Sequence, residues 1–409
     1  MRTRFWPIFL LVILTTPAVG QEWARFRGPN GDGIGKASLP TTWTEKDQAW
    51  KVATPGIGHS SPIAWGNKLF ITSCDRATGQ RIVLCYSLDE GKLLWKKETD
   101  GGKSPLHQRN SYATSTPVAD EKNVYVSWAT KDNYTVAAYD HDGKPVWQQD
   151  LGPYKSQHGM GVSPIRFDDL VIVANDQDDG GSLVALNSAD GKVRWTIPRK
   201  PKNATYATPC VFQIGKRAPE IIFANWQHGV TAVDPKAGKV NWEISVFNTK
   251  TNERSIASPI VAGDLILTTC GFVTGVKHHV ALRVGEDGKP VEAWRLERQV
   301  SYMPTPIIKG DRVFLTSEQG WATCLDLQKG TEIWQERIGG GFSASPVAAG
   351  DYLYCIANDG VVHVLKMGDK YDRVGKVELG EPTQSTPAIA GGKLIIRTEK
   401  SLIAINGSK

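Results

Sequence analysis

Closely spaced cysteines are absent from this sequence. Its six cysteines are scattered at positions 74, 85, 210, 270, 324 and 355, without a C-x-x-C motif or an adjacent Cys-Cys pair. This excludes the usual zinc-binding and thioredoxin-like spacings. Cys74 and Cys85 flank a hairpin-like stretch, and two states stay open for them: a cross-strand disulfide, which an exported protein would allow, or two buried free thiols.

A strong excess of one charge is also missing. Lys and Arg number 48 against 42 Asp and Glu, and no stripe of basic residues is present, so a nucleic-acid partner is not expected.

Only the first 20 residues contain a marked apolar run, between a basic start and the small residues Ala18 and Gly20. The pattern predicts a secretory signal peptide over 1–20, because the run is shorter than a membrane-spanning segment. No transmembrane segment is predicted elsewhere.

Catalytic and metal-binding motifs are lacking as well. The sequence has neither a G-x-S-x-G elbow nor a C-x-x-C-H haem site. The acidic stretch NDQDDGG (Asn175–Gly181) has Gly180 at a ligand position, and Asn187 stands where an EF-hand needs Glu. It therefore predicts a polar hairpin turn. His278 and His279 are adjacent on an expected strand and would point to opposite faces. We expect no catalytic residue and no metal site.

What the sequence does have is an internal repeat. A Ser/Thr-Pro pair occurs eight times, with prolines at 62, 117, 164, 209, 259, 306, 346 and 387, so the repeat length averages about 46 residues. Each pair opens a short apolar strand, followed by a Gly/Asp/Asn turn and a second strand, as in SPIAWGNKLFITS (Ser61–Ser73). Proline is tolerated at the first residue of a strand, where its missing N–H breaks no interior hydrogen bond.

Two further strands complete the first seven repeats. In five of them the last strand carries a tryptophan four residues after a turn glycine, as in Gly91 and Trp95; the spacing is six for Gly288 and Trp294, and the seventh repeat has no such tryptophan. Four strands per repeat of this length are typical of a β-propeller blade. The eighth repeat ends after three strands, and Gln48–Gly56 resembles the missing fourth. The sequence therefore predicts an all-β, eight-bladed propeller of four-stranded antiparallel blades over 48–409, closed by this N-terminal strand. Residues 21–47 are predicted to form an ordered strap across the ring.

One repeat also indicates a family. AVDPKAGKVNW (Ala232–Trp242) resembles the tryptophan-docking motif of quinoprotein-type (PQQ-repeat) eight-bladed propellers, and ALNSADGKVRW (Ala185–Trp195) is a near match with Asn187 at the Asp position. The resemblance extends over nearly all of the chain after the signal peptide. It implies that these tryptophans pack between adjacent blades. The residues expected in this role are Trp50, Trp95, Trp147, Trp195, Trp242, Trp294 and Trp334.

The resemblance implies one of two functions. One branch of the family binds pyrroloquinoline quinone (PQQ) with Ca²⁺ and oxidises alcohols or sugars, whereas BamB-like proteins use the ring as a scaffold without a cofactor. Because this chain lacks the adjacent cysteines, the haem site and the long insertions of many such enzymes, we predict a non-enzymatic, BamB-like scaffold without a cofactor. A PQQ-dependent dehydrogenase is the alternative, and a carbohydrate-binding propeller is a third possibility.

The predicted scaffold is exported and binds a protein or peptide, rather than nucleic acid, in the periplasm or another envelope compartment. It is expected to be soluble, since no cysteine for lipid attachment follows the apolar core, and a monomer is expected. The loops before the Ser/Thr-Pro pairs join an outer strand to the next inner strand, so they should lie on one rim. The candidate partner-binding residues on this rim are His59, His107, Arg109, Asn110, Tyr112, His158, Met160, Tyr206, Arg254, Tyr302 and Phe342.

Overall fold

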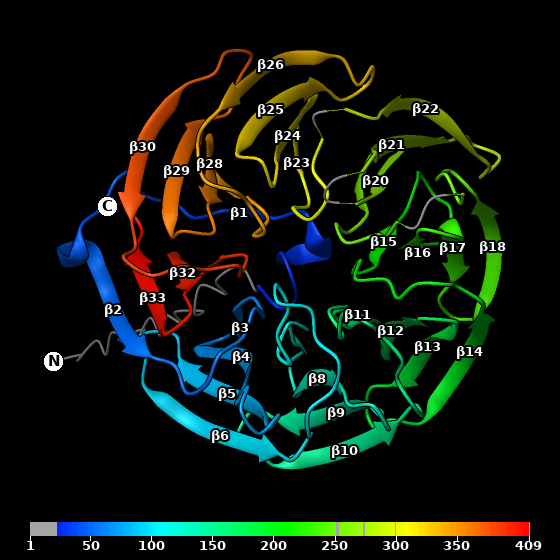
Figure 1. The fold of residues 1–409 in the computed structure, drawn as a ribbon, viewed down its shortest axis with the longest axis horizontal. Coiled ribbons are helices and arrows are strands. Elements are labelled where there is room, and N and C mark those ends of the chain that lie inside the picture. The colour runs from blue at the N-terminus through cyan, green and yellow to red at the C-terminus, as the bar shows by residue number, and fades with distance from the viewer. Residues whose placement is uncertain (1–22, 251–252, 273–274, 299, 409) are drawn as a thin grey trace, which may run out of the picture.

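The computed structural model describes residues 23–250, 253–272, 275–298 and 300–408. Over these residues, strands β1 to β33 and two short 3-10 helices form a ring of eight sheets, and the sheets are arranged like blades around a central axis (Figure 1). The prediction of an all-β, eight-bladed propeller is confirmed. The predicted signal peptide over 1–20 lies outside the described residues. No described helix is both long enough and apolar enough to span a membrane.

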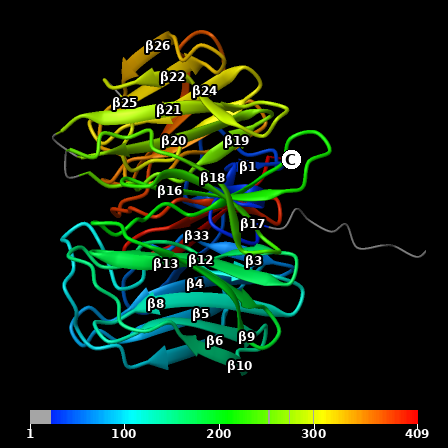
Figure 2. The ribbon, with the colours of Figure 1, turned by 90° about the vertical axis from the view of Figure 1, so that its right-hand side faces the viewer.

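The first blade shows how the repeat folds. Its inner strand β3 (Ile63–Trp65) is followed by β4 (Lys68–Cys74), β5 (Arg81–Ser87) and the outer strand β6 (Leu93–Thr99), all antiparallel. The two middle strands are almost entirely buried, whereas β6 alternates between exposed and half-buried residues. The apolar middle strands therefore pack between neighbouring blades, and the polar outer strand faces solvent. Figure 2 shows the ring edge-on, with strands running across its thickness.

The other blades repeat this order. Blades 2 to 4 comprise β7 (Val118–Ala119), β8 (Asn123–Ala129), β9 (Tyr134–Asp140) and β10 (Pro145–Asp150); β11 (Ile165–Phe167), β12 (Leu170–Gln177), β13 (Gly180–Asn187) and β14 (Val193–Arg199); and β15 (Cys210–Phe212), β16 (Glu220–Asn225), β17 (Gly229–Asp234) and β18 (Lys239–Ile244). Blades 5 to 7 comprise β19 (Ile260–Ala262), β20 (Leu265–Gly271), β21 (Lys277–Val284) and β22 (Pro290–Leu296); β23 (Ile307–Lys309), β24 (Arg312–Thr316), β25 (Trp321–Asp326) and β26 (Glu332–Arg337); and β27 (Val347–Ala349), β28 (Tyr352–Ile356), β29 (Val361–Lys366) and β30 (Arg373–Glu378).

Blade 8 is built from both ends of the chain. Strands β31 (Ala388–Ala390), β32 (Lys393–Arg397) and β33 (Ser401–Asn406) are joined by β2 (Gln48–Ala53), which pairs antiparallel with β33 as the outer strand. Blade 7 has a fifth strand that the sequence analysis did not anticipate. Strand β1 (Ile34–Gly35) pairs parallel with its inner strand β27.

The strap over residues 23–47 includes the 3-10 helices η1 (Pro29–Gly31) and η2 (Glu45–Asp47). It runs from the centre of the ring outward to β2 (Figure 1). Its first part lies at the centre of the ring, where the chain is dark blue in Figure 1. The carbonyls of Trp23 and Ala24 accept hydrogen bonds from inner residues of blades 1 and 2, and the Gly33 carbonyl accepts one from blade 7. The strap thus ties together blades from the beginning and the end of the chain.

Arg27 anchors the strap at the axis. Its side chain is fully buried and donates hydrogen bonds to the carbonyls of Thr305 (3.0 Å), Pro306 (2.6 Å) and Pro346 (2.9 Å). Burial lowers the pKa of this guanidinium to about 9. These contacts hold the strap against the inner strands of blades 6 and 7.

Six of the seven tryptophans named above donate their indole N–H to a backbone carbonyl of the next blade. Trp242 is the exception, because its N–H faces Glu220 of its own blade at 3.4 Å. For five of the six, all but Trp334, the indole ring also covers the turn glycine of the next blade, and a Cβ at Gly191 would lie 2.5 Å from Trp147. The six donor–acceptor pairs are Trp50–Leu88, Trp95–His141, Trp147–Ser188, Trp195–Pro235, Trp294–Leu327 and Trp334–Gly368, at 2.7–3.0 Å.

The cysteines are buried, and the acidic stretch Asn175–Gly181 forms part of a hairpin. All six cysteines are buried free thiols. The disulfide alternative for Cys74 and Cys85 is wrong, because the pairing of β4 with β5 places Cys74 opposite Arg81 and Cys85 opposite Phe70. The expected hairpin turn is present between β12 and β13.

Candidate functional site

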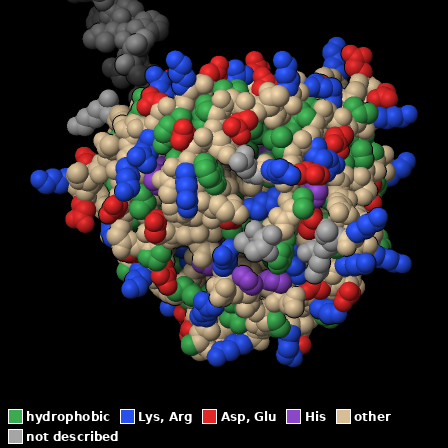
Figure 3. All heavy atoms as spheres, turned by 45° about the horizontal axis from the view of Figure 1, so that its top comes forward, with side chains coloured by type: hydrophobic (Ala, Val, Ile, Leu, Met, Phe, Trp, Pro, Cys, Tyr) green, Lys and Arg blue, Asp and Glu red, His purple; other side chains and the backbone are tan. Residues whose placement is uncertain are grey.

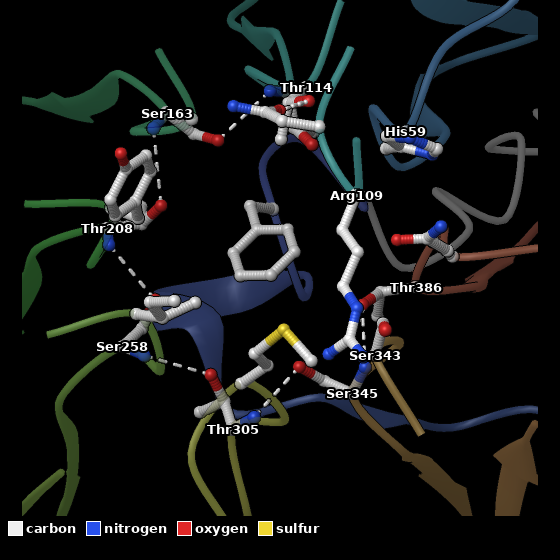
Figure 4. Close-up of a pocket in the computed structure, with 18 of the residues that line it drawn as sticks. His59, Arg109, Thr114, Ser163, Thr208, Ser258, Thr305, Ser343, Ser345 and Thr386 are labelled. Atoms are coloured by element: carbon white, nitrogen blue, oxygen red, sulfur yellow. Dashed lines mark hydrogen bonds between the residues drawn. The ribbon is translucent and has the colours of Figure 1, made fainter. Parts of the chain in front are cut away.

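The Ser or Thr of each Ser/Thr-Pro pair takes part in a belt of hydrogen bonds around the central channel (Figure 4). In each link, the backbone N–H of one blade donates to the hydroxyl oxygen of the next. A hydroxyl at this place satisfies a buried N–H that no strand partner reaches. The seven links run in order through Ser61, Thr116, Ser163, Thr208, Ser258, Thr305, Ser345 and Thr386, at 2.9–3.3 Å.

This belt forms the throat of a funnel with a volume of about 260 Å³. The rim loops that precede the Ser/Thr-Pro pairs form its mouth, and Phe26 of the strap also lines it. Figure 4 shows the Arg109 side chain extending into the funnel on the side of Ser343 and Thr386. Histidine atoms and basic side chains gather around the hollow on the face seen in Figure 3. The funnel is the main candidate site.

Eight of the eleven candidate rim residues line this funnel. The loops around the mouth bring them together from blades that are distant in the sequence, as the rim prediction requires. They are His59, His107, Arg109, Asn110, His158, Tyr206, Arg254 and Tyr302.

Three candidates lie elsewhere, so their placement at the mouth was wrong. Tyr112 and Met160 line a separate cavity of about 250 Å³, and the Tyr112 ring lies under the Arg81 guanidinium at 4.3 Å. Phe342 is fully buried and contacts His363 edge-to-face, with ring centroids 6.0 Å apart. Their large side chains turn into the spaces between blades, where burial of apolar surface is favourable.

Other lining residues were missed by the sequence analysis. The belt hydroxyls had a clear signal, since each directly precedes a proline of the repeat. Phe26 had none, because it reaches the funnel from the strap through long-range packing. The remaining missed residues are Thr114, Gly161, Ile256, Phe272, Met303, Ser343 and Gln384.

The funnel is basic and polar. Among the described residues that line it are two arginines and three histidines but no Asp or Glu. Burial, followed by Arg397 and Arg76, lowers the pKa of His59 to about 4. Burial, followed by Arg254 and His107, also lowers the pKa of His158. Arg109 and Arg254 each bring a permanent positive charge to the funnel.

Neighbouring groups hold the basic side of the mouth in place. The rings of His107 and His158 stack with centroids 5.0 Å apart, and the Asn110 amide donates to the His158 carbonyl at 2.8 Å. The backbone N–H of Arg109 donates to Nδ1 of His107 at 3.1 Å. Arg254 is buried, and its backbone exchanges two hydrogen bonds with Gly271. The mouth is thus fixed by contacts that do not use the Arg109 side chain.

A buried ion pair fixes the loop before blade 6. Glu318 accepts hydrogen bonds from the backbone N–H groups of Tyr302 (2.7 Å) and Met303 (2.5 Å). The same carboxylate pairs with Lys277 at 2.6 Å, and both side chains are almost fully buried. Glu318 therefore holds the backbone of the rim loop at Tyr302 and Met303 in place.

The funnel does not fit PQQ with Ca²⁺. Calcium sites are built from carboxylate and other oxygen ligands, and the expected dehydrogenase chemistry also needs a carboxylate base. The described lining residues supply no carboxylate. Within the described part of the chain, no group of three or more His, Cys, Asp or Glu could hold a metal ion.

Comparison with known families matches residues 41–208 and 80–336 to the family described as outer membrane protein assembly factor BamB. The chain belongs to this family. BamB from Yersinia pestis is 23% identical over 368 residues, which cover 85% of each protein. The family resemblance expected from the repeat motif is thereby confirmed.

Solved structures of two kinds share the fold of this BamB-family chain. BamB from Moraxella catarrhalis superposes with a TM-score of 0.63 at 14% identity, covering 87% of this chain and 98% of the other. Quinohemoprotein alcohol dehydrogenase from Comamonas testosteroni has a TM-score of 0.65 at 11% identity, with coverage of 95% and 81%. At such identities the likeness shows the fold alone, and function must be argued from the site.

Proposed function

We propose that this BamB-family propeller is a non-catalytic scaffold of the bacterial cell envelope that binds a protein or peptide partner through the mouth of its funnel. The observation that carries the proposal is the lining itself: arginine, histidine and aromatic side chains converge on a concave site whose described residues include no carboxylate. Arg and aromatic residues are enriched in protein interfaces, and such a site offers binding groups rather than an acid–base pair.

Two arguments support the proposed location and partner class. The predicted signal peptide over 1–20 would export the chain, and its relative from Yersinia pestis is named as an outer membrane protein assembly factor. The ring suits a scaffold, because its blades are joined by the hydroxyl belt, the tryptophans and the strap. We also propose that the chain is a soluble monomer after its signal peptide has been cleaved.

Site-specific photocrosslinking of the full chain in bacterial cells tests this proposal. A photoreactive residue replaces Gln384 in the funnel, and the control replaces the exposed Lys122, on the turn between β7 and β8 at the opposite end of the strands. We expect an envelope protein to be captured from position 384 but not from position 122, and the same adduct to form from the two purified proteins. Equal capture from both positions, or none from position 384, would contradict the proposal.

A further inference from the structure

Three side chains that line the funnel have a polar atom without a hydrogen-bond partner. Arg254, His158 and Ser343 belong to the lining, and Nε of Arg254, Nδ1 of His158 and Oγ of Ser343 are buried and unpartnered. Arg254 itself is only 5% exposed. A buried polar group is stabilised by a hydrogen-bond partner, so three side chains with such atoms around one cavity favour a ligand that contacts them there.

These atoms define the polar end of that ligand. The guanidinium groups can only donate, and the serine hydroxyl can donate as well. A group with several acceptor positions and a negative charge suits these donors, and it meets no acidic residue among the described lining residues. Arginine binds carboxylates with strong charge-assisted hydrogen bonds. The exposed Arg109, which extends into the same funnel (Figure 4), adds a second positive charge.

Apolar side chains define the rest of the ligand. Phe26, Ile256, Phe272 and Met303 also line the funnel, and Phe272 is 42% exposed. A small hydrated anion would leave this apolar surface in water, whereas an apolar group next to the anion would cover it. The volume of about 260 Å³ is near the lower end of ligand sites. It has room for a group of roughly one apolar residue.

We infer that the funnel binds a carboxylate attached to an apolar group, as at the C-terminal residue of a polypeptide. The inference rests on the proposed function, and it names the part of the partner that enters the site: an apolar C-terminal residue whose carboxylate meets Arg254 and Arg109. The same chemistry occurs in free monocarboxylic acids with an apolar body. The experiment below separates these two sources.

Isothermal titration calorimetry of the purified protein tests the inference with three probes. They are a short peptide ending in Phe with a free carboxylate, the same peptide with a C-terminal amide, and 3-phenylpropionate. We expect the free-carboxylate peptide to bind at least about tenfold more tightly than the amide, because the amide has no charge for the arginines. It should also bind more tightly than 3-phenylpropionate, since the mouth contacts further residues of a peptide.

Two variants locate the binding site. Arg109→Gln should weaken binding of the free-carboxylate peptide about tenfold or more, because it removes one charge-assisted contact. Arg109 is exposed, so the fold should persist, and an unchanged melting temperature checks this. Lys122→Gln removes the same charge on the far side of the blade and should leave affinity unchanged. Equal losses in both variants would show a long-range charge effect and overturn the inference.

The outcomes separate this inference from the proposed function. Equal binding of the acid and amide peptides, or no binding of either, overturns the carboxylate inference even if position 384 captures a protein. Binding of 3-phenylpropionate as tight as that of the peptide overturns the polypeptide source and identifies a small-molecule receptor. Failure of crosslinking together with selective binding of the acid peptide would instead contradict the envelope-scaffold proposal alone.

Discussion

The Arg217 guanidinium lies over Gly288, at the place where other blades receive a tryptophan from the preceding blade. Nη1 of Arg217 also donates to the Glu286 carbonyl at 3.1 Å. Arg217 belongs to the unusually long turn between β15 and β16, and Gly288 stands six residues before Trp294 instead of the usual four. Two irregular repeats therefore meet at one interface, where an arginine replaces the docking indole.

This difference predicts unequal effects of alanine at two turn glycines. Gly191 and Gly288 have φ values of +73° and +78°, so alanine costs about 1–2 kcal/mol of strain at either. At Gly191 the new Cβ also collides with the rigid Trp147 ring at 2.5 Å, which adds roughly 1–3 kcal/mol. At Gly288 it meets only the flexible end of Arg217.

Chemical denaturation of the two variants tests the comparison. Gly191→Ala should lower the midpoint clearly more than Gly288→Ala does. Equal shifts would mean that the Trp147 ring moves as easily as the Arg217 side chain, and that the indole does not lock the interface.

The fold could be predicted in detail because its signals are local and recur. The Ser/Thr-Pro pairs mark inner strands such as β3, and the spacing from Gly91 to Trp95 marks outer strands. An irregular repeat is recognised from the regular spacing of the others. The pairing of β1 with β27 could not be predicted, since a two-residue strand far from its partner leaves no periodic signal.

The site was predictable only in part. Loop position follows from connectivity, so His59 and Arg254 were correctly placed on the rim of the funnel. The direction of a side chain in a loop depends on the packing of the next blade, and for this reason Phe342 points into the core instead. Phe26 enters the funnel from the strap, which Arg27 anchors through contacts between residues almost 280 positions apart.

The hydroxyl belt should contribute measurably to stability. Ser258→Ala removes the acceptor for the backbone N–H of Thr208, which lies 3.0 Å from Oγ. A buried N–H left without a partner costs about 1–3 kcal/mol. The free energy of unfolding should fall by this amount, whereas Ser258→Thr should be close to wild type because other blades use threonine here. Ser408→Ala, at an exposed serine, is the control, and an equal loss there would contradict the role of the belt.

Arg27 should hold the strap in the channel. Arg27→Met keeps the length of the side chain but leaves the carbonyls of Thr305, Pro306 and Pro346 without this donor. Each unsatisfied buried group costs about 1–3 kcal/mol, so the strap should open more often. Hydrogen exchange at the amide of Ala348, which donates to the Gly33 carbonyl, should become faster. Lys46→Met in exposed η2 is the control, and unchanged exchange in Arg27→Met would refute the anchoring role.

A buried histidine should make stability depend on pH. His279 is fully buried, and burial lowers its pKa to about 4, whereas the unfolded chain has a pKa of about 6.5. Between these values the unfolded state binds the extra proton, so stability is lost as the pH falls. The loss is about 2 kcal/mol from about pH 7.5 to about pH 5.

His279→Leu isolates this effect, since leucine does not titrate. The denaturation midpoints of the wild-type protein and of the variant are compared at both pH values, and the variant should lose less stability on acidification. Equal acid sensitivity of the two proteins would assign the pH dependence to other groups, such as His59 and His363, whose pKa values burial also lowers to about 4.

Titration with PQQ and Ca²⁺ tests the enzymatic alternative. The lining offers Arg109, Arg254 and hydroxyl groups but, among its described residues, no carboxylate, so Ca²⁺ should have no ligand set and substrate no base. We expect no calcium-dependent rise in melting temperature and no dye-linked oxidation of alcohols or sugars. Because PQQ itself carries carboxylates, weak binding without calcium would be compatible with the funnel, and the free-carboxylate peptide should displace it. Saturable, calcium-dependent binding with turnover would instead show that this ring is an enzyme.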